Sequence, residues 1–68
     1  MTDDERRLLE MLAGSVDGTT DALLVAHGFD FDLIACLVLE RLATATPERV
    51  FAGATRVRIT DAGRRALT

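Results

Sequence analysis

The sequence has few of the residues from which most catalytic and metal sites are built. Its 68 residues include one cysteine and one histidine, with neither tryptophan nor tyrosine. Cys36 has no partner for a disulfide within the chain and no basic neighbour in sequence that would make it a nucleophile. His27 belongs to no cluster of cysteines, histidines or acids at metal-ligand spacing. We therefore expect no enzymatic activity, no metal and no cofactor.

The sequence also lacks long apolar runs, and its first residues do not predict a signal peptide. No run approaches the about 18 apolar residues that a membrane span requires. The first residues, MTDDERR, have neither the basic nor the apolar region of a signal peptide. We expect a protein of the cytoplasm that makes no use of a membrane.

The length and composition predict one small domain over residues 1–68. Hydrophobic residues make up 49% of the chain and charged residues 28%, which is an ordinary globular mixture. A chain of 68 residues is too short for a deep catalytic cleft. Because so short a chain without disulfides commonly gains stability by association, we expect a homo-oligomer, most simply a homodimer.

Basic charge is scarce in the first two thirds of the chain. The net charge of −3 excludes a uniformly basic nucleic-acid-binding surface. Residues 1–48 carry a net charge of −7, whereas residues 49–68 carry +4. The basic part contains five arginines: Arg49, Arg56, Arg58, Arg64 and Arg65. They could form a solvated face, contact phosphate groups, or attract the acidic helices of another subunit.

Capping residues and glycines predict two helices before residue 28. Thr2 and Glu5 have the spacing of a capping box, in which the Glu5 carboxylate accepts from the Thr2 amide, and Gly14 stands where this first helix would end. After an Asp-Gly turn, Thr19 or Thr20 can cap a shorter second helix that runs to about His27. Apolar residues recur at helical spacing in both segments.

A third helix is expected from Phe31 to about Thr44, with Asp30 as its N-cap. Placed at about 100° per residue, one stripe of this helix is apolar and is predicted to face the core; it consists of Phe31, Ala35, Val38 and Leu42. The opposite face consists of Leu33, Cys36, Leu37 and Glu40. Two interpretations of this second face remain open. Either the helix is rotated and its leucines belong to the core, or they form an exposed apolar strip that marks a partner surface.

The pattern changes to extended segments after Pro47. Strands are predicted over residues 48–52 and 56–60, joined by a three-residue loop at 53–55. In the second strand Val57 and Ile59 alternate with Arg56 and Arg58, which indicates a half-buried ribbon. Thr60 can then cap a last short helix that runs through Leu67.

This order of helix, helix, helix, strand, strand and helix predicts a mostly α fold with a small β-hairpin, of the α+β class. The segment RVRITDAGRRAL, from Arg56 to Leu67, resembles the end of the wing and the following helix in winged helix-turn-helix regulators of the MarR type. The resemblance implies a DNA-binding or transcription-regulatory protein that binds double-stranded DNA. Its third helix would enter the major groove and its wing arginines would contact phosphate groups.

The third helix departs from what this resemblance implies. Arg41 is its only basic residue, and Asp30, Asp32 and Glu40 would repel phosphate groups. Two hypotheses follow. The chain is a DNA-binding regulator that relies on the wing and on dimerisation, or it is a protein-interaction module that has the fold and does not read DNA.

Overall fold

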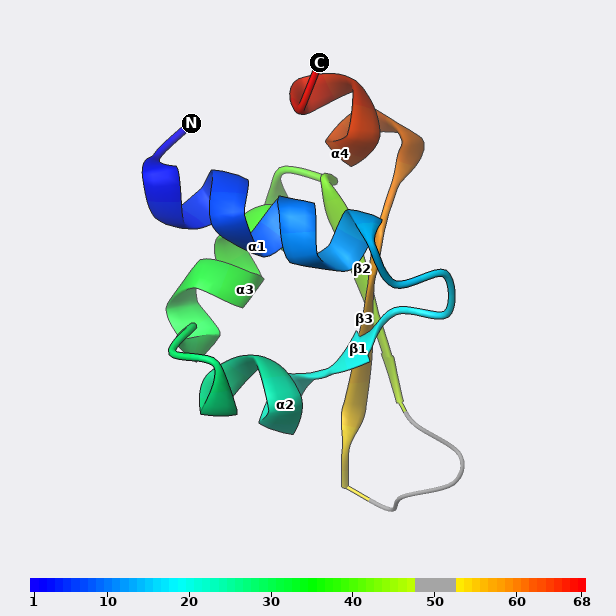
Figure 1. The fold of residues 1–68 in the computed structure, drawn as a ribbon. Coiled ribbons are helices and arrows are strands. Elements are labelled where there is room, and N and C mark those ends of the chain that lie inside the picture. Colours follow the sequence, from blue (N-terminus) through cyan, green and yellow to red (C-terminus); the bar gives the residue numbers. More distant parts are fainter. Residues whose placement is uncertain (48–52) are drawn as a thin grey trace.

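The computed structural model describes residues 1–47 and 53–68, which form four helices and a three-stranded antiparallel sheet (Figure 1). The elements follow one another as α1 (Asp3–Ala13), β1 (Thr19–Thr20), α2 (Asp21–Ala26), α3 (Phe31–Leu39), β2 (Ala43–Pro47), β3 (Thr55–Ile59) and α4 (Asp61–Ala66). The expectation of an α+β fold is confirmed at this level. The strand β1, between the first two helices, was not predicted.

Each of the four helices begins at a side-chain cap. The hydroxyl of Thr20 accepts from the amide of Leu23, the carboxylate of Asp30 from Leu33 at 2.7 Å, and the hydroxyl of Thr60 from Gly63 at 3.0 Å. At α1 the Thr2 hydroxyl accepts from the Glu5 amide and donates to the Glu5 carboxylate, so this carboxylate binds the hydroxyl rather than the Thr2 amide that we expected. The predicted caps Thr2, Asp30 and Thr60 are confirmed, and of the two caps left open for α2 the structure uses Thr20.

The third helix ends five residues earlier than predicted. Arg41 has a left-handed backbone, with φ of 62°, and its amide donates to the carbonyl of Val38. The amide of Leu42 donates to the carbonyl of Leu37 at 2.9 Å, which completes a Schellman motif. The same motif ends α2, where Gly28 has φ of 97°. The left-handed residue after α2 is a glycine, which signals the end of a helix in the sequence. After α3 this residue is Arg41, and an arginine gives no such signal.

Because α3 ends early, the hairpin begins early too. Its first strand is Ala43–Pro47, which includes the proline that we placed after a helix. Its second strand begins at Thr55 rather than Arg56 and ends at Ile59, and Thr60 then caps α4. The strand predicted over residues 48–52 lies outside the described residues.

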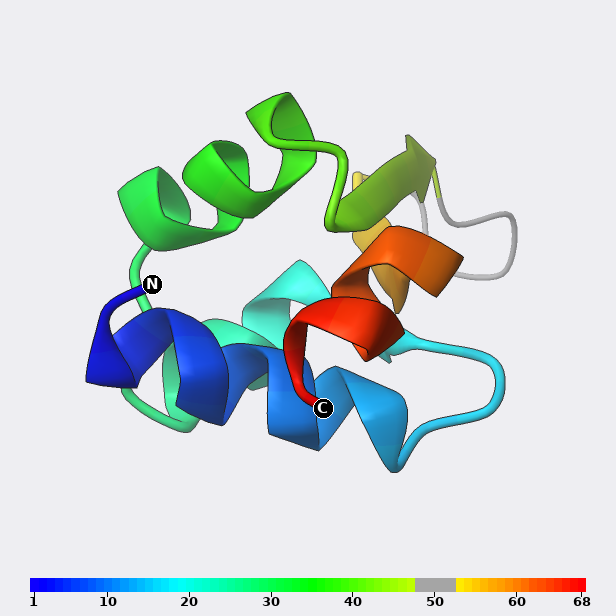
Figure 2. The same ribbon diagram turned by 90° about the horizontal axis from the view of Figure 1, so that it is seen from above.

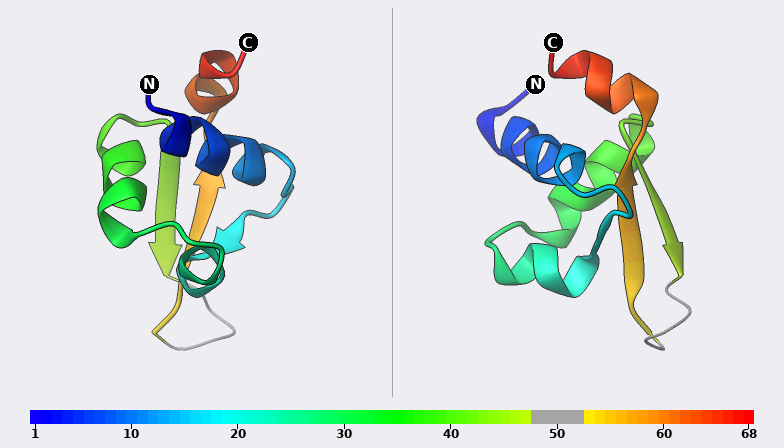
Figure 3. Two further views of the ribbon diagram at one scale, coloured as in Figure 1. Left: turned by 60° about the vertical axis from the view of Figure 1, so that its left-hand side comes forward. Right: turned by 45° about the vertical axis from the view of Figure 1, so that its right-hand side comes forward.

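The central strand of the sheet is β3, with β1 on one side and β2 on the other. Val57 of β3 pairs with both Thr19 and Ala45 and is fully buried. Figure 3 shows α1, α2 and α3 on one face of the sheet, with α4 beyond the end of β3. The core between them contains Leu8, Leu9 and Leu12 of α1, Leu24, Phe29, Ile34, Leu37, Ala43 and Val57. Arg56 and Arg58, which alternate with Val57, project from the opposite face.

The last helix packs against the link between α3 and β2 (Figure 2). The Thr60 hydroxyl donates to the carbonyl of Arg41 at 2.7 Å, and the Thr60 amide donates to the carbonyl of Leu42. Gly63 is buried there, and a Cβ atom on it would collide with the Leu42 carbonyl oxygen. This contact explains why α4 contains a glycine, a residue that is otherwise unfavourable inside a helix.

Candidate functional site

The outward face of α3 includes two apolar residues that we expected to be buried, Phe31 and Ala35. Leu37 is fully buried and Ile34 is 7% exposed, whereas Phe31 is 60% and Leu39 82% exposed. Ala35 is exposed as well. The predicted core stripe was therefore wrong at Phe31 and Ala35. Val38 and Leu42, its other two members, are half-buried and pack against the core.

This error has a physical cause. Apolar residues occur on every side of α3, so their periodicity does not select one face. In α1, by contrast, the three buried leucines lie on one side of the helix and charged residues on the other. Only the helices and strands packed around α3 decide which of its apolar residues are enclosed.

The four residues of α3 that we considered for a partner interface are divided by the structure. Leu37 belongs to the core, so the interpretation of a rotated helix holds for this residue. Leu33 is half-buried and packs against the same core. Cys36 and Glu40 are exposed. An apolar surface on α3 does exist, but it consists of other residues.

An apolar groove lies between the exposed face of α3 and the sheet. It has a volume of about 420 Å³, and its α3 wall includes Phe31, Ala35 and Leu39. Ala45 of β2 and Val57 of β3 line it from the sheet, together with Ile34, Val38, Thr55 and Asp21. Asp21 links α2 to β3 beside the groove, because its carboxylate accepts from the amides of Ala22 and Thr55 at 2.8 and 3.1 Å.

Three arginines of the basic part gather around one segment, residues 13–18, which joins α1 to β1. Arg56 donates to the carbonyls of Asp17 and Gly18, and Nε of Arg58 donates to Asp17 at 3.1 Å. Arg64 of α4 donates to the carbonyl of Ala13 at 3.5 Å. These guanidinium groups therefore hold the 13–18 segment against β3 and α4.

The remaining two arginines are not placed in this cluster. Arg65 is exposed on α4, and Arg49 lies outside the described residues. Sequence analysis grouped all five by charge alone and did not foresee that three of them bind backbone carbonyls. Such contacts cannot be predicted from the sequence, because residues 56 and 17 are far apart along the chain.

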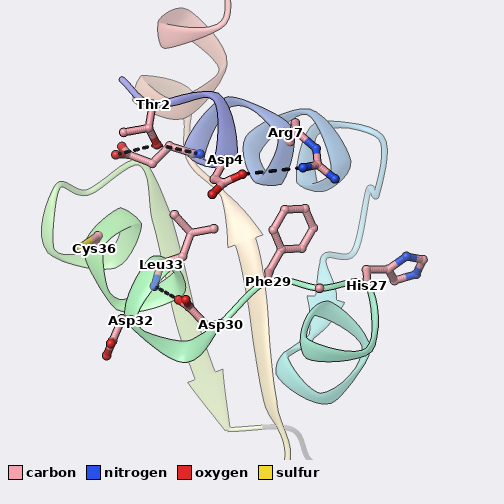
Figure 4. Close-up of a pocket in the computed structure, with 11 residues that line it drawn as sticks. Thr2, Asp4, Arg7, His27, Phe29, Asp30, Asp32, Leu33 and Cys36 are labelled. Carbon is pink, nitrogen blue, oxygen red and sulfur yellow. Dashed lines mark hydrogen bonds and ion pairs between the residues drawn. The ribbon is translucent and has the colours of Figure 1, made fainter.

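A second hollow, of about 390 Å³, lies between the first turn of α1 and the start of α3 (Figure 4). Arg7 lines it, and its guanidinium lies 3.6 Å from the Asp4 carboxylate and 5.9 Å from the centre of the Phe29 ring. His27 and Cys36 lie at opposite ends of this hollow. Within residues 1–47 and 53–68 no three histidine, cysteine or acidic residues are placed to hold a metal ion.

Two further findings bear on function. In the part of the chain that the structure describes, no helix has the length and apolar character to cross a lipid bilayer. Comparison with family models, with curated proteins and with solved structures finds no match to this chain. The groove and the arginines are therefore the features that bear on the function of this chain.

Proposed function

We propose that this chain is a winged-helix-type domain that acts through protein contacts at the exposed face of α3. The order of the elements supports the resemblance to winged-helix proteins, because α2, a tight turn and α3 are followed by a hairpin and a closing helix. In this interpretation α2 and α3 form the helix-turn-helix, and β2 and β3 form the wing.

The observation that carries the proposal is the chemistry of α3. The described side chains on its outward face are apolar or acidic: Phe31, Asp32, Ala35, Cys36, Leu39 and Glu40. Base edges in the major groove are read chiefly by arginine, lysine, asparagine and glutamine, and α3 has none of these. An exposed apolar surface beside a groove is instead typical of protein recognition.

The test places a photo-reactive amino acid at Ala35 and, as a control, at Val16, which is 93% exposed and is not among the residues that line the groove. Cross-linking in the source cells is expected to give a protein adduct from position 35 alone. The captured protein, once identified and purified, must bind the wild-type chain and the Val16→Asp variant, and lose affinity for Leu39→Asp. Nucleic-acid adducts at position 35, or equal binding to both variants, would contradict the proposal.

A second candidate function, DNA binding by the basic part, is favoured by the anchoring of its arginines. The hydrogen bond from Nε of Arg58 fixes its side chain and leaves its terminal amino groups for other acceptors. With Arg65 on α4, this part presents positive charge from two elements. Phosphate contacts need no base-reading helix, so they would give affinity with little sequence preference.

Fluorescence anisotropy with a labelled duplex at low salt tests this candidate. Arg58→Ala combined with Arg65→Ala should weaken binding and lower the slope of log affinity against log salt by about 2, because each phosphate contact contributes about 0.9. Arg6→Ala, which removes an exposed arginine of the acidic part, is the matched control. If the wild-type protein does not bind the duplex at low salt, the candidate is wrong.

A further inference from the structure

We propose that the groove beside α3 binds an amphipathic helix of another protein, with an apolar face and a flank of lysine or arginine. This inference rests on the proposed function and names the chemistry of its partner. It begins from the α3 strip, which we define as Phe31, Ala35 and Leu39. The two large side chains of the strip are 60% and 82% exposed, and the groove beside it is lined by Ala45 and Val57.

The spacing of the α3 strip favours a helix as the occupant. Its residues are four apart, so they form one ridge of the kind that fits between the ridges of a second helix. The small side chain of Ala35 leaves a depression between Phe31 and Leu39, into which one large side chain of a partner can insert. With nine residues, α3 is about 13 Å long, which matches two to three turns of a partner helix.

The charges around the groove favour a basic flank on that helix. Asp32 is exposed on α3 and lies three residues before Ala35, on the flank of the strip. Asp21 is a second carboxylate, and it lines the groove itself. These carboxylates belong to the part of the chain with a net charge of −7. A partner with lysine or arginine beside its apolar face would complement them, and an acidic partner would be repelled.

A second copy of this chain brings acidic charge to the same surface. Residues 1–48, which include α3, carry a net charge of −7, so like charges meet when the α3 faces of two copies approach each other. This repulsion opposes self-association at the groove.

The helix α4 of a second copy does not have the features of the proposed occupant. Its arginines lie on a six-residue helix, and Leu67, which follows it, packs against the core of its own subunit. This helix therefore has a basic side but no large free apolar side chain to enter the groove. We therefore propose a partner helix from another protein.

The probe for this test is a synthetic helical peptide with leucines four residues apart, lysines on the flanks and one tryptophan. Because the chain has no tryptophan or tyrosine, the emission of the peptide is measured without background from the protein. A saturable blue shift with the wild-type chain is expected. A matched peptide with glutamates in place of the lysines should bind at least about fivefold more weakly at low salt, where screening is small.

Two variants locate the binding surface. Leu39→Asp should weaken binding of the lysine peptide about tenfold or more, because it replaces an apolar contact by a charge. Val16→Asp changes an apolar residue that is 93% exposed and does not line the groove, and it should leave the affinity unchanged. Circular dichroism checks that both variants fold.

Three outcomes would overturn the inference: equal binding of the two peptides, equal binding to wild type and Leu39→Asp, or a wild-type dimer in light scattering that Leu39→Asp dissociates. The first would refute the basic flank, the second the groove and the third the foreign partner. The proposed function is judged separately by cross-linking at Ala35, since a partner captured there without a basic helix would support the function and refute this inference.

Discussion

The exposed face of α3 and the arginines of β3 and α4 are two surfaces for which the sequence predicts opposite degrees of exposure. The apolar residues Phe31 and Ala35 were predicted to be buried and are exposed, whereas Arg56 and Arg58 were predicted to be available and bind backbone carbonyls. Residue type therefore did not decide availability. What decided it was which groups lay within reach after the chain had folded.

The largest expected effect is a difference in stability between two leucine variants of α3. Leu37→Asp should unfold the domain, because a charge at a fully buried position costs more than the few kcal/mol of stability that a small domain has. Leu39→Asp, at a position that is 82% exposed, should change the free energy of unfolding by less than about 0.5 kcal/mol. Urea denaturation followed by circular dichroism measures both. Equal losses of stability would mean that α3 is rotated from the orientation described above.

A smaller effect is expected where α4 meets the link between α3 and β2. Gly63→Ala should cost about 1–3 kcal/mol, because the added Cβ would collide with the Leu42 carbonyl. The matched control is Gly14→Ala, where the nearest atom to a Cβ would be 3.6 Å away and the backbone is already right-handed. A shift in the thermal midpoint is expected for the first variant alone. If Gly63→Ala has the stability of the wild type, the close packing that fixes α4, and with it Arg64 and Arg65, is absent in solution.

The smallest expected effect is a difference in stability between two arginine variants of the basic part. Arg58→Ala should cost about 1 kcal/mol, because it removes the hydrogen bond to the Asp17 carbonyl. Arg65→Ala removes an exposed side chain and should be close to neutral. Amide hydrogen exchange of residues 13–18 gives a second measurement, with faster exchange expected only for Arg58→Ala. Unchanged exchange in both variants would show that the guanidinium does not hold this segment.

The parts of the fold that depend on local chemistry were predictable. Thr2, Thr20, Asp30 and Thr60 each satisfy amides within three residues, so the helix starts could be read from the order of residues. The end of α2 was also readable, since Gly28 adopts a conformation that other residues rarely adopt. At the end of α3, Arg41 adopts a left-handed conformation without any such signal, and the predicted helix continued to Thr44.

The candidate site was less predictable than the fold. Sequence reasoning identified α3 as an acidic helix with an apolar surface, and it named Cys36 and Glu40, which are exposed. It did not identify the α3 strip, because a helix with apolar residues on all sides has no preferred buried face until its neighbours are in place. Nor did it foresee Asp21 at the groove, whose contact with Thr55 joins residues far apart in the chain.

The sequence alone determined the uneven distribution of charge, the helix starts and the α+β class, since these depend on composition and on contacts between near neighbours. The tertiary structure decided the orientation of α3, the groove beside the sheet and the use of Arg56, Arg58 and Arg64 as anchors for the 13–18 segment. Those features depend on burial and on hydrogen bonds between distant residues, and neither is fixed until the chain has packed.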